Sequence, residues 1–143
     1  MAQLLSSTKL LKNGDGEVVH SSDVLKDKVV ALYFSAHWCP PCRMFTPVLK
    51  DFHSNLKGEF EVVFVSCDES EEEMNEYLEE EHGDWYYIPF GNSAIEELNT
   101  KYEISGIPTL IIVGSNGDVI DRQARNAVQE NKPQESLQKW KSA

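Results

Sequence analysis

Two cysteines of the 143-residue chain, Cys39 and Cys42, are separated by two prolines in the run Trp38-Cys39-Pro40-Pro41-Cys42. Thiols at this spacing can form an internal disulfide or supply two ligands to a metal ion, because a thiolate is both the nucleophile of disulfide exchange and a metal ligand. In the first case Cys39 attacks a disulfide, and Cys42 then displaces the reduced partner and closes the Cys39–Cys42 bond. The motif therefore indicates thiol–disulfide chemistry or half of a zinc site.

The flanking sequence places Cys39 where a strand gives way to a helix. Residues 28–36 form a continuous apolar run with β-branched and aromatic side chains, which is typical of a strand buried on both faces. From Pro41 the apolar residues follow helical spacing at Phe45, Val48, Leu49, Phe52 and Leu56. We expect Pro47 to bend this helix and Gly58 to end it. Since unpaired N–H groups and the helix dipole stabilise an anion at this junction, we expect a lowered pKa for Cys39.

Two alternatives to redox chemistry stay open at this point. A zinc site needs four ligands, but the chain has no second C-x-x-C motif, and His37 and His53 are poorly spaced to complete a set. The other alternative is a pair of inert buried thiols, which leaves the two prolines at a strand-to-helix corner without a reason. Reactive thiols account for the motif better, and we expect no metal.

The rest of the chain alternates between strand and helix patterns. Further strands are predicted at 8–12 and 17–19 around a turn at 13–16, at 61–67, and at 109–113 and 118–120 around Ser115-Asn116-Gly117. Helices are predicted to begin at Ser70 and Ser93 and to lie around 136–141, and 85–90 is predicted to be a short apolar link. This order predicts one α/β domain over 1–143, with a mixed sheet flanked by helices and an N-terminal β-hairpin.

The composition narrows the classes of partner and compartment. The formal charge is −11 and the pI about 4.7, which disfavours nucleic acids and anionic membranes as partners. Nine carboxylates lie within residues 68–81, either as a solvated helix face or as a surface that attracts a basic partner. Apolar runs are too short to span a membrane, and residues 1–11 have no leader pattern, so we expect a soluble cytoplasmic protein, with the nucleus as the alternative.

These residues together resemble a known family. The run Trp38-Cys39-Pro40-Pro41-Cys42, followed later by Gly106-Ile107-Pro108-Thr109, resembles the thioredoxin superfamily and, in its W-C-P-P-C form, the tryparedoxin and nucleoredoxin branch. The similarity also covers residues 32–36, 43, 45–47, 65–69 and 123–125. It implies a thioredoxin fold and a dithiol–disulfide oxidoreductase.

The resemblance also implies roles for single residues. Cys39 would be the nucleophile and Cys42 the resolving thiol, with a cis Ile107–Pro108 bond against their disulfide. The implied substrate-binding residues are Trp38, Pro40, Pro41, Ile107 and Pro108, and weaker candidates are Asp68, Glu69 and Arg125. Many thioredoxins have a buried Asp six residues before the first cysteine, whereas this chain has Tyr33. The group that accepts the proton of the resolving thiol is therefore unidentified.

Three residues near the motif have more than one interpretation. Trp38 is either an exposed partner contact or a core side chain. His37 is either an exposed loop residue or, when protonated, a group that lowers the pKa of Cys39. Cys67 is expected to pack as a small apolar residue, with a regulatory thiol as the alternative.

The leading functional hypothesis is a reductase of protein disulfides, such as those of peroxiredoxin-like peroxidases. It needs an external thiol or reductase as electron donor and no cofactor besides the Cys39–Cys42 couple, and we expect a monomer. A second hypothesis is a nucleoredoxin-like module that binds a partner in one redox state with little turnover. A third is a disulfide-forming oxidant or isomerase; an oxidant would have a reduction potential well above the roughly −270 mV of thioredoxin.

Overall fold

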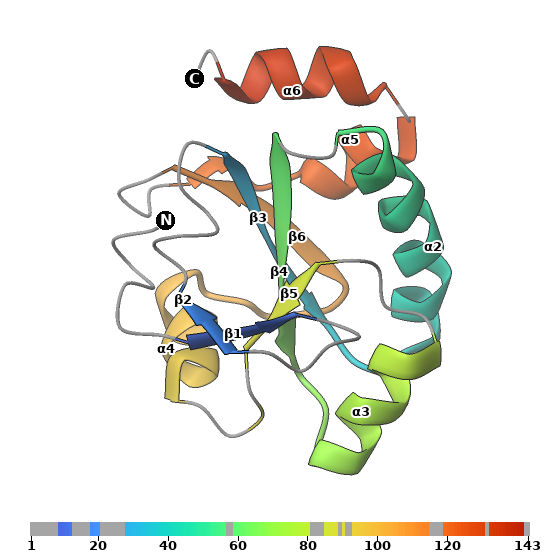
Figure 1. The fold of residues 1–143 in the computed structure, drawn as a ribbon, viewed down its shortest axis with the longest axis vertical. Coiled ribbons are helices and arrows are strands. Elements are labelled where there is room, and N and C mark those ends of the chain that lie inside the picture. Colours follow the sequence, from blue (N-terminus) through green and yellow to red (C-terminus); the bar gives the residue numbers. More distant parts are fainter. Residues whose placement is uncertain are drawn as a thin grey trace.

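The computed structural model describes residues 9–12, 18–20, 28–56, 59–80, 85–88, 90, 93–114, 119–130 and 132–141. Within these ranges the chain forms one mixed sheet flanked by helices (Figure 1). The strands are β1 (Lys9–Lys12), β2 (Val18–His20), β3 (Val29–Ser35), β4 (Phe60–Ser66), β5 (Tyr86–Tyr87), β6 (Thr109–Val113) and β7 (Val119–Asp121). The helices are α2 (Pro40–Ser54), α3 (Glu71–Glu80), α4 (Ser93–Lys101), α5 (Ala124–Glu130) and α6 (Pro133–Lys141).

The described strands are arranged in the order β2-β1-β5-β4-β3-β6-β7. The central strands β3 and β4 are parallel, as are β4 and β5, whereas β6 is antiparallel to β3. The predicted N-terminal hairpin is confirmed by the antiparallel pairing of β1 with β2, and the late hairpin by that of β6 with β7. The predicted turns at 13–16 and 115–117 lie outside the described residues. The predicted fold class, a mixed α/β sheet with an N-terminal hairpin, is confirmed.

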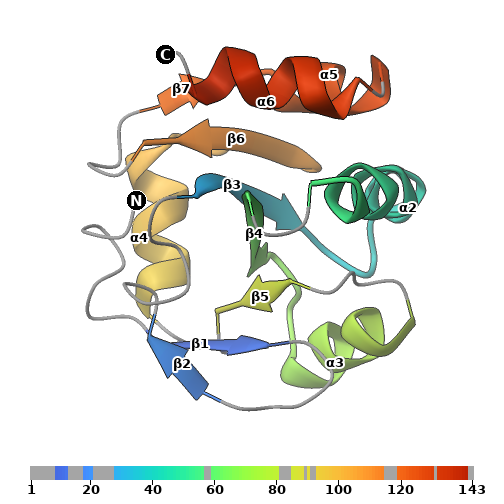
Figure 2. The same ribbon diagram turned by 45° about the horizontal axis from the view of Figure 1, so that its top comes forward.

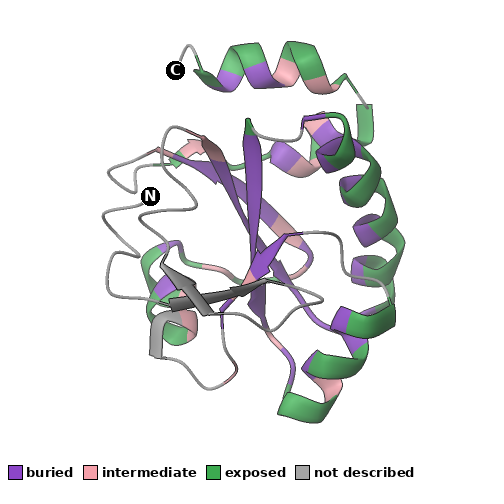
Figure 3. Cartoon of the chain, viewed as in Figure 1, coloured by how far each residue is buried: buried purple, intermediate pink, exposed green. Residues whose placement is uncertain are grey.

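Each central strand sends alternate side chains to two different helical layers. In β3, Val30, Leu32 and Phe34 pack on the face that α4 covers. Ala31 and Tyr33 face the opposite side, where α2, α3, α5 and α6 contribute to the core. Figure 2 shows α4 alone on one side of the sheet, and Figure 3 shows the central strands buried except at the first residues of β3 and β6, which are half-buried. Burial on both faces explains the continuous apolar run of β3.

The helix after the cysteines runs through Pro47 but ends at Ser54, so the prediction that Gly58 ends it is wrong. Two side chains close its last turn earlier, because Ser54 Oγ and Asn55 Nδ2 both donate to the carbonyl of Asp51, at 2.7 and 2.9 Å. Such local bonds compete with continued helix. Gly58 itself lies outside the described residues.

Two other elements differ from the sequence prediction. The predicted apolar link after Trp85 contains β5, which pairs with both β4 and β1 and so joins the outer hairpin to the central sheet. Helix α5 was not predicted, and it packs against β6 through Ala124 and Val128. The predicted starts near Ser70 and Ser93 are confirmed by α3 and α4. None of the described helices is long and apolar enough to cross a membrane.

Candidate functional site

Cys39 lies at the start of α2, directly after the loop that leaves β3. It is the N-cap residue of the helix, with extended backbone angles of φ −99° and ψ 106°, and its Sγ accepts a hydrogen bond from the backbone N–H of Cys42 at 3.4 Å. Pro40 and Pro41 occupy the first two helical positions, where the missing N–H groups cost nothing. The predicted junction is confirmed, and it places the sulfur where the helix N-terminus favours a negative charge.

Cys42 lies one turn behind Cys39 and is fully buried. Burial and a hydrogen bond with Cys39 raise the pKa of the Cys42 thiol to about 12, while a hydrogen bond with the Ser35 side chain opposes this rise. The two thiols therefore differ in their surroundings. Cys39 is 4% exposed and caps the helix N-terminus, whereas Cys42 has no exposed surface.

The Ile107–Pro108 peptide bond is cis, as the resemblance implied. Its loop lies against the first cysteine, with Cys39 Sγ 3.9 Å from the Ile107 carbonyl oxygen. Pro108 is buried and Ile107 is half-buried. The structure thus brings both residues to Cys39, together with the exposed Pro40 and Pro41.

Trp38 is 52% exposed, so the alternative of a core tryptophan is wrong. Its indole Nε1 donates to the carbonyl of Cys67 at 3.3 Å, which fixes the ring beside the cysteines. Cys67 follows the end of β4 and packs against Cys39 and Cys42. Burial and the neighbouring Asp68 raise the pKa of Cys67 to about 11, which disfavours its thiolate at neutral pH.

Asp68 ties the active-site loop to the end of β4. One of its carboxylate oxygens accepts the backbone N–H of His37 at 2.7 Å, and the other accepts the Ser66 hydroxyl at 2.7 Å. Burial raises the pKa of Asp68 above its usual value, although these two hydrogen bonds oppose the rise. The weaker candidate Glu69 is exposed, and its backbone N–H bonds to Glu73 of α3. Asp68 therefore shapes the loop, and Glu69 points outward from it.

The ring of His37 contacts α3. Its Nε2 lies 2.9 Å from Glu80 Oε2 and its Nδ1 lies 4.0 Å from Glu76 Oε2. The ring also packs 5.9 Å from that of Tyr77. The interpretation as an exposed loop histidine is wrong, because the side chain is only 21% exposed and its contacts bind the loop to the acidic helix.

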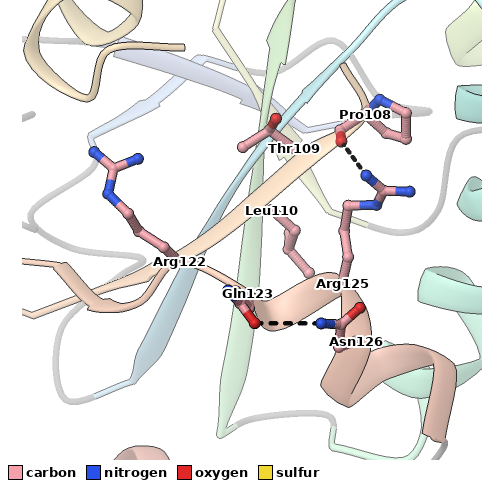
Figure 4. A pocket seen from close by; sticks show the side chains of 7 residues that line it. All are labelled: Pro108, Thr109, Leu110, Arg122, Gln123, Arg125 and Asn126. Carbon is pink, nitrogen blue, oxygen red and sulfur yellow. Dashed lines mark hydrogen bonds between the residues drawn. The ribbon is translucent and has the colours of Figure 1, made fainter. Parts of the chain in front are cut away.

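Arg125 of α5 holds the far side of the cis-proline loop. Its Nη1 donates to the carbonyl of Pro108 at 2.9 Å, and its guanidinium lies 5.8 Å from the ring centroid of Phe45. A shallow pocket of about 240 Å³ lies here, lined by Pro108, Thr109, Leu110, Arg122, Gln123, Arg125 and Asn126 (Figure 4). Arg122 extends away from Arg125 in this view and donates to the carbonyl of Tyr102 at 2.7 Å. The two guanidinium groups therefore do not converge.

Sequence reasoning missed a group of buried hydroxyls behind Cys42, which we call the hydroxyl cluster. Its members are Tyr33, Ser35, Thr46 and Tyr77, all fully buried. Two regularities could have indicated part of it: Ser35 faces the same side of β3 as Tyr33, and Thr46 follows Cys42 by one helical turn. Tyr77 comes from α3, and its approach follows only from the fold.

The described residues contain no group of three or more His, Cys, Asp or Glu side chains arranged to hold a metal ion. The structure has Cys39, Cys42 and Cys67 as free thiols. This arrangement supports thiol–disulfide exchange, because one sulfur lies at a helix N-terminus and the other is buried one turn behind it.

Comparisons with known proteins agree with this geometry. A family model described as thioredoxin-like matches residues 27–119. Nucleoredoxin of Mus musculus is 45% identical over 120 residues, which cover 81% of this chain and 27% of nucleoredoxin. The chain thus spans about a quarter of the length of the nucleoredoxins that it matches.

Two solved structures match over most of both chains. Thioredoxin from Wuchereria bancrofti is 52% identical, with a TM-score of 0.84 over 96% of each chain. Tryparedoxin II in complex with glutathionylspermidine is 37% identical, with a TM-score of 0.77 over 89% of this chain and 88% of that chain. The sheet described above is therefore a thioredoxin fold with added outer strands.

Proposed function

This chain belongs to the thioredoxin-like family of oxidoreductases, in its tryparedoxin and nucleoredoxin branch, and from that premise we propose that it reduces protein disulfides through a Cys39/Cys42 dithiol–disulfide cycle. The observation that carries the proposal is the unequal placement of the two thiols. Cys39 caps the N-terminus of α2, and Cys42 is buried one turn behind it, with its backbone N–H bonded to the Cys39 sulfur.

In the first step the Cys39 thiolate attacks a disulfide of the partner, forms a mixed disulfide and releases one partner thiol. In the second step the Cys42 sulfur attacks Cys39, closes the internal disulfide and releases the second thiol. An external thiol or reductase then reduces the Cys39–Cys42 bond. The cycle needs no cofactor beyond the two cysteines.

Trp38, Pro40, Pro41 and Ile107 surround Cys39 and are the residues proposed to contact the partner, with Pro108 behind them. An extended segment of the partner can bond to the backbone of Ile107 in the manner of an added strand. Asp68 and Arg125 act indirectly in this proposal, because one holds the His37 backbone and the other holds the Pro108 carbonyl.

The proposed partners are proteins with an accessible disulfide, such as peroxiredoxin-like peroxidases. Binding of glutathionylspermidine by the related tryparedoxin II supports a glutathione-type thiol as the electron donor. We place the monomeric protein in the cytoplasm or the nucleus, where thiols are kept reduced. Its charge of −11 makes nucleic acids and anionic membranes poor partners.

A second function, a redox-dependent binding module, is favoured by the apolar exposure near Cys39. Besides Trp38, the α2 side chain of Met44 is 77% exposed. Such side chains can hold a partner without turnover. The experiment below separates the two functions.

The test measures reduction of insulin disulfides with glutathione, glutathionylspermidine or a thioredoxin reductase as alternative donors. We expect Cys39→Ser to abolish turnover, and Cys42→Ser to stop after the first step and accumulate a mixed disulfide. Cys67→Ser is the matched control and keeps full turnover. The reductase proposal is wrong if Cys42→Ser turns over as fast as the unmodified protein. It is also wrong if the unmodified protein does not raise the rate of insulin reduction above that of any donor alone.

A further inference from the structure

The hydroxyl cluster runs from the Ser35 side chain, which favours the Cys42 thiolate, to the Cys42 carbonyl. Ser35 Oγ and Tyr77 OH lie 2.6 Å apart, and Tyr77 OH and Thr46 Oγ1 also lie 2.6 Å apart. At the other end Thr46 donates to the Cys42 carbonyl at 2.9 Å. Tyr33 completes the cluster, 2.7 Å from Thr46 Oγ1 and 3.2 Å from the same carbonyl. The resolving thiol thus faces buried hydroxyls from two other elements.

The described residues give Cys42 no carboxylate neighbour. The titratable groups that face it are Cys39 at the start of α2, Tyr33 from β3, Tyr77 from α3 and Cys67 after β4. Burial raises the pKa of both tyrosines, so the cluster is neutral at neutral pH. The only side-chain hydrogen bond that lowers the pKa of Cys42 comes from Ser35. A group that assists this thiol must therefore work without a charge of its own.

Counting protons shows what the cluster can do. Each hydroxyl donates one proton and can accept others. When Tyr77 donates to Thr46, Ser35 donates to Tyr77, and the Ser35 oxygen can accept the proton of the Cys42 thiol. When Tyr77 donates to Ser35 instead, Tyr33 supplies the proton to Thr46, and the Ser35 proton can point at the Cys42 sulfur. The two arrangements use the same positions of the oxygen atoms.

We propose that Ser35 and Tyr77 are a positioning pair for Cys42, with Ser35 accepting from the thiol at rest and donating to the sulfur when it attacks. This inference rests on the proposed reductase function and deepens it. It assigns to two hydroxyls the place that a buried carboxylate fills in the thioredoxins that have one. The Tyr77 proton turns from Thr46 to Ser35 as the charge on the sulfur develops.

The reaction balances without any further reactant. The S–S bond between Cys39 and the partner breaks, and the Cys39–Cys42 bond forms. The electron pair of the broken bond stays on the partner sulfur, which takes up the proton that Cys42 loses. The hydroxyls hold no extra proton at any stage, so Ser35 is not a general base, and its hydrogen bond stabilises the transient thiolate.

The test follows both steps separately with 5,5′-dithiobis(2-nitrobenzoate), in a Cys67→Ser background so that two thiols react. Attack by Cys39 releases one coloured thiolate, and displacement by Cys42 releases a second. We expect Ser35→Ala and Tyr77→Phe to slow the second release about tenfold near neutral pH, as loss of a hydrogen bond to a developing charge implies. The pH profile of the second release moves to higher pH, and the first release is unchanged.

Three further variants separate positioning from packing. Tyr33→Phe removes a hydroxyl that bonds to Thr46 but leaves the Ser35–Tyr77 bond, so it slows the second release less than Tyr77→Phe does and leaves the first release unchanged. Ser35→Thr keeps the hydroxyl and restores the second release. The Ser35→Ala and Tyr77→Phe effects do not add in the double variant, because the two residues act as a unit.

Urea unfolding shows which variants are folded. If Ser35→Ala does not fold, the measurement on Tyr77→Phe alone tests the proposal. The positioning pair is refuted if the second release keeps its rate and pH profile in Tyr77→Phe, or if both releases slow by one factor. A single release from the unsubstituted Cys39/Cys42 pair would instead contradict the reductase function itself.

Discussion

Two buried polar clusters lie at opposite ends of strand β3, and they differ in charge. At the carboxyl end lies the hydroxyl cluster, which is neutral and adjoins Cys42. At the amino end Glu61 accepts from Lys28 at 3.5 Å and bonds to His53 at 3.1 Å, with His53 and Glu61 both buried. The second cluster, Lys28, His53 and Glu61, is called the ionic cluster below.

The difference follows from what each end must do. A fixed carboxylate beside Cys42 would raise the pKa of that thiol further, because like charges oppose ionisation. Hydroxyls can reverse their hydrogen bonds as the sulfur changes charge, and they carry no charge of their own. No group changes charge during the reaction at the amino end, so the hydrogen bond between His53 and Glu61 can join α2 to β4 permanently. The hydroxyl cluster can therefore change its hydrogen bonds during the reaction, whereas the ionic cluster keeps the same contacts.

The largest effect is expected from breaking the ionic cluster. Glu61→Ala leaves the His53 ring buried among Phe60 and Trp85 without its carboxylate partner. We expect the free energy of unfolding in urea to fall by about 2 kcal/mol, as for a buried polar side chain left without its hydrogen-bond partner. Both thiol releases should keep their rates, because the change lies far from Cys39.

Glu61→Gln is the matched control, since its amide keeps the hydrogen bond to His53 and loses only the charge. A smaller loss of stability is expected for it. If Glu61→Gln unfolds at the same urea concentration as the unsubstituted protein, the charge of Glu61 contributes nothing and the contrast between the two ends fails.

A smaller effect is expected from opening the neutral cluster. Thr46→Val keeps the shape of the side chain but removes the donor to the Cys42 carbonyl and a partner of Tyr33 and Tyr77. Each tyrosine keeps a partner besides Thr46, and the two hydroxyls also lie 3.5 Å apart, so we expect a loss of about 1.5 kcal/mol in urea unfolding. Thr46→Ser keeps the hydroxyl and is the control.

The same variant tests whether this end is uncharged. Since burial raises the pKa of Tyr33 and Tyr77, the loss caused by Thr46→Val should be equal near pH 6 and near pH 8, well below the usual tyrosine value of about 10. If the loss of unfolding free energy differs between pH 6 and pH 8, an ionised side chain takes part in the cluster.

The parts of the fold that depend on long apolar patterns were predictable. A strand buried on both faces, such as β3, has a continuous apolar run, whereas a helix buried on one side, such as α2, has apolar residues every three or four positions. The change from one pattern to the other predicted the strand-to-helix junction and hence the position of Cys39. Helix α5 was not predictable in this way. Its seven residues bury only Ala124 and Val128, which is a single helical repeat.

The hydroxyl cluster illustrates why the site was predicted only in part. The sequence pattern indicated the inward face of α3 from Met74, Tyr77 and Leu78, and all three are buried. That pattern counts the ring of Tyr77 as apolar and says nothing of where its hydroxyl points. The hydroxyl meets Ser35 only because α3 crosses the end of β3, which is a property of the tertiary fold. Local sequence therefore predicted the reacting sulfurs but not the groups around them.

The smallest effect concerns Asp68, a buried carboxylate that bonds to the active-site loop. Because burial raises its pKa, the folded protein holds a proton at a pH where the unfolded chain has lost it. Its contribution to stability is thus fully present below the unfolded value of about 3.9 and is lost as the pH rises through the folded value.

Asp68→Asn removes this titration, and its amide oxygen can still accept the His37 backbone N–H. We expect the stability of the unsubstituted protein, relative to that of the variant, to fall as the pH is raised from about 4, the region of carboxyl titration. Urea unfolding of both proteins across that range measures the difference. A difference that stays constant would mean that Asp68 titrates alike in the folded and unfolded chains. In that case the hydrogen bonds from His37 and Ser66 fully offset its burial, and the site end would tolerate a fixed charge as readily as the opposite end does.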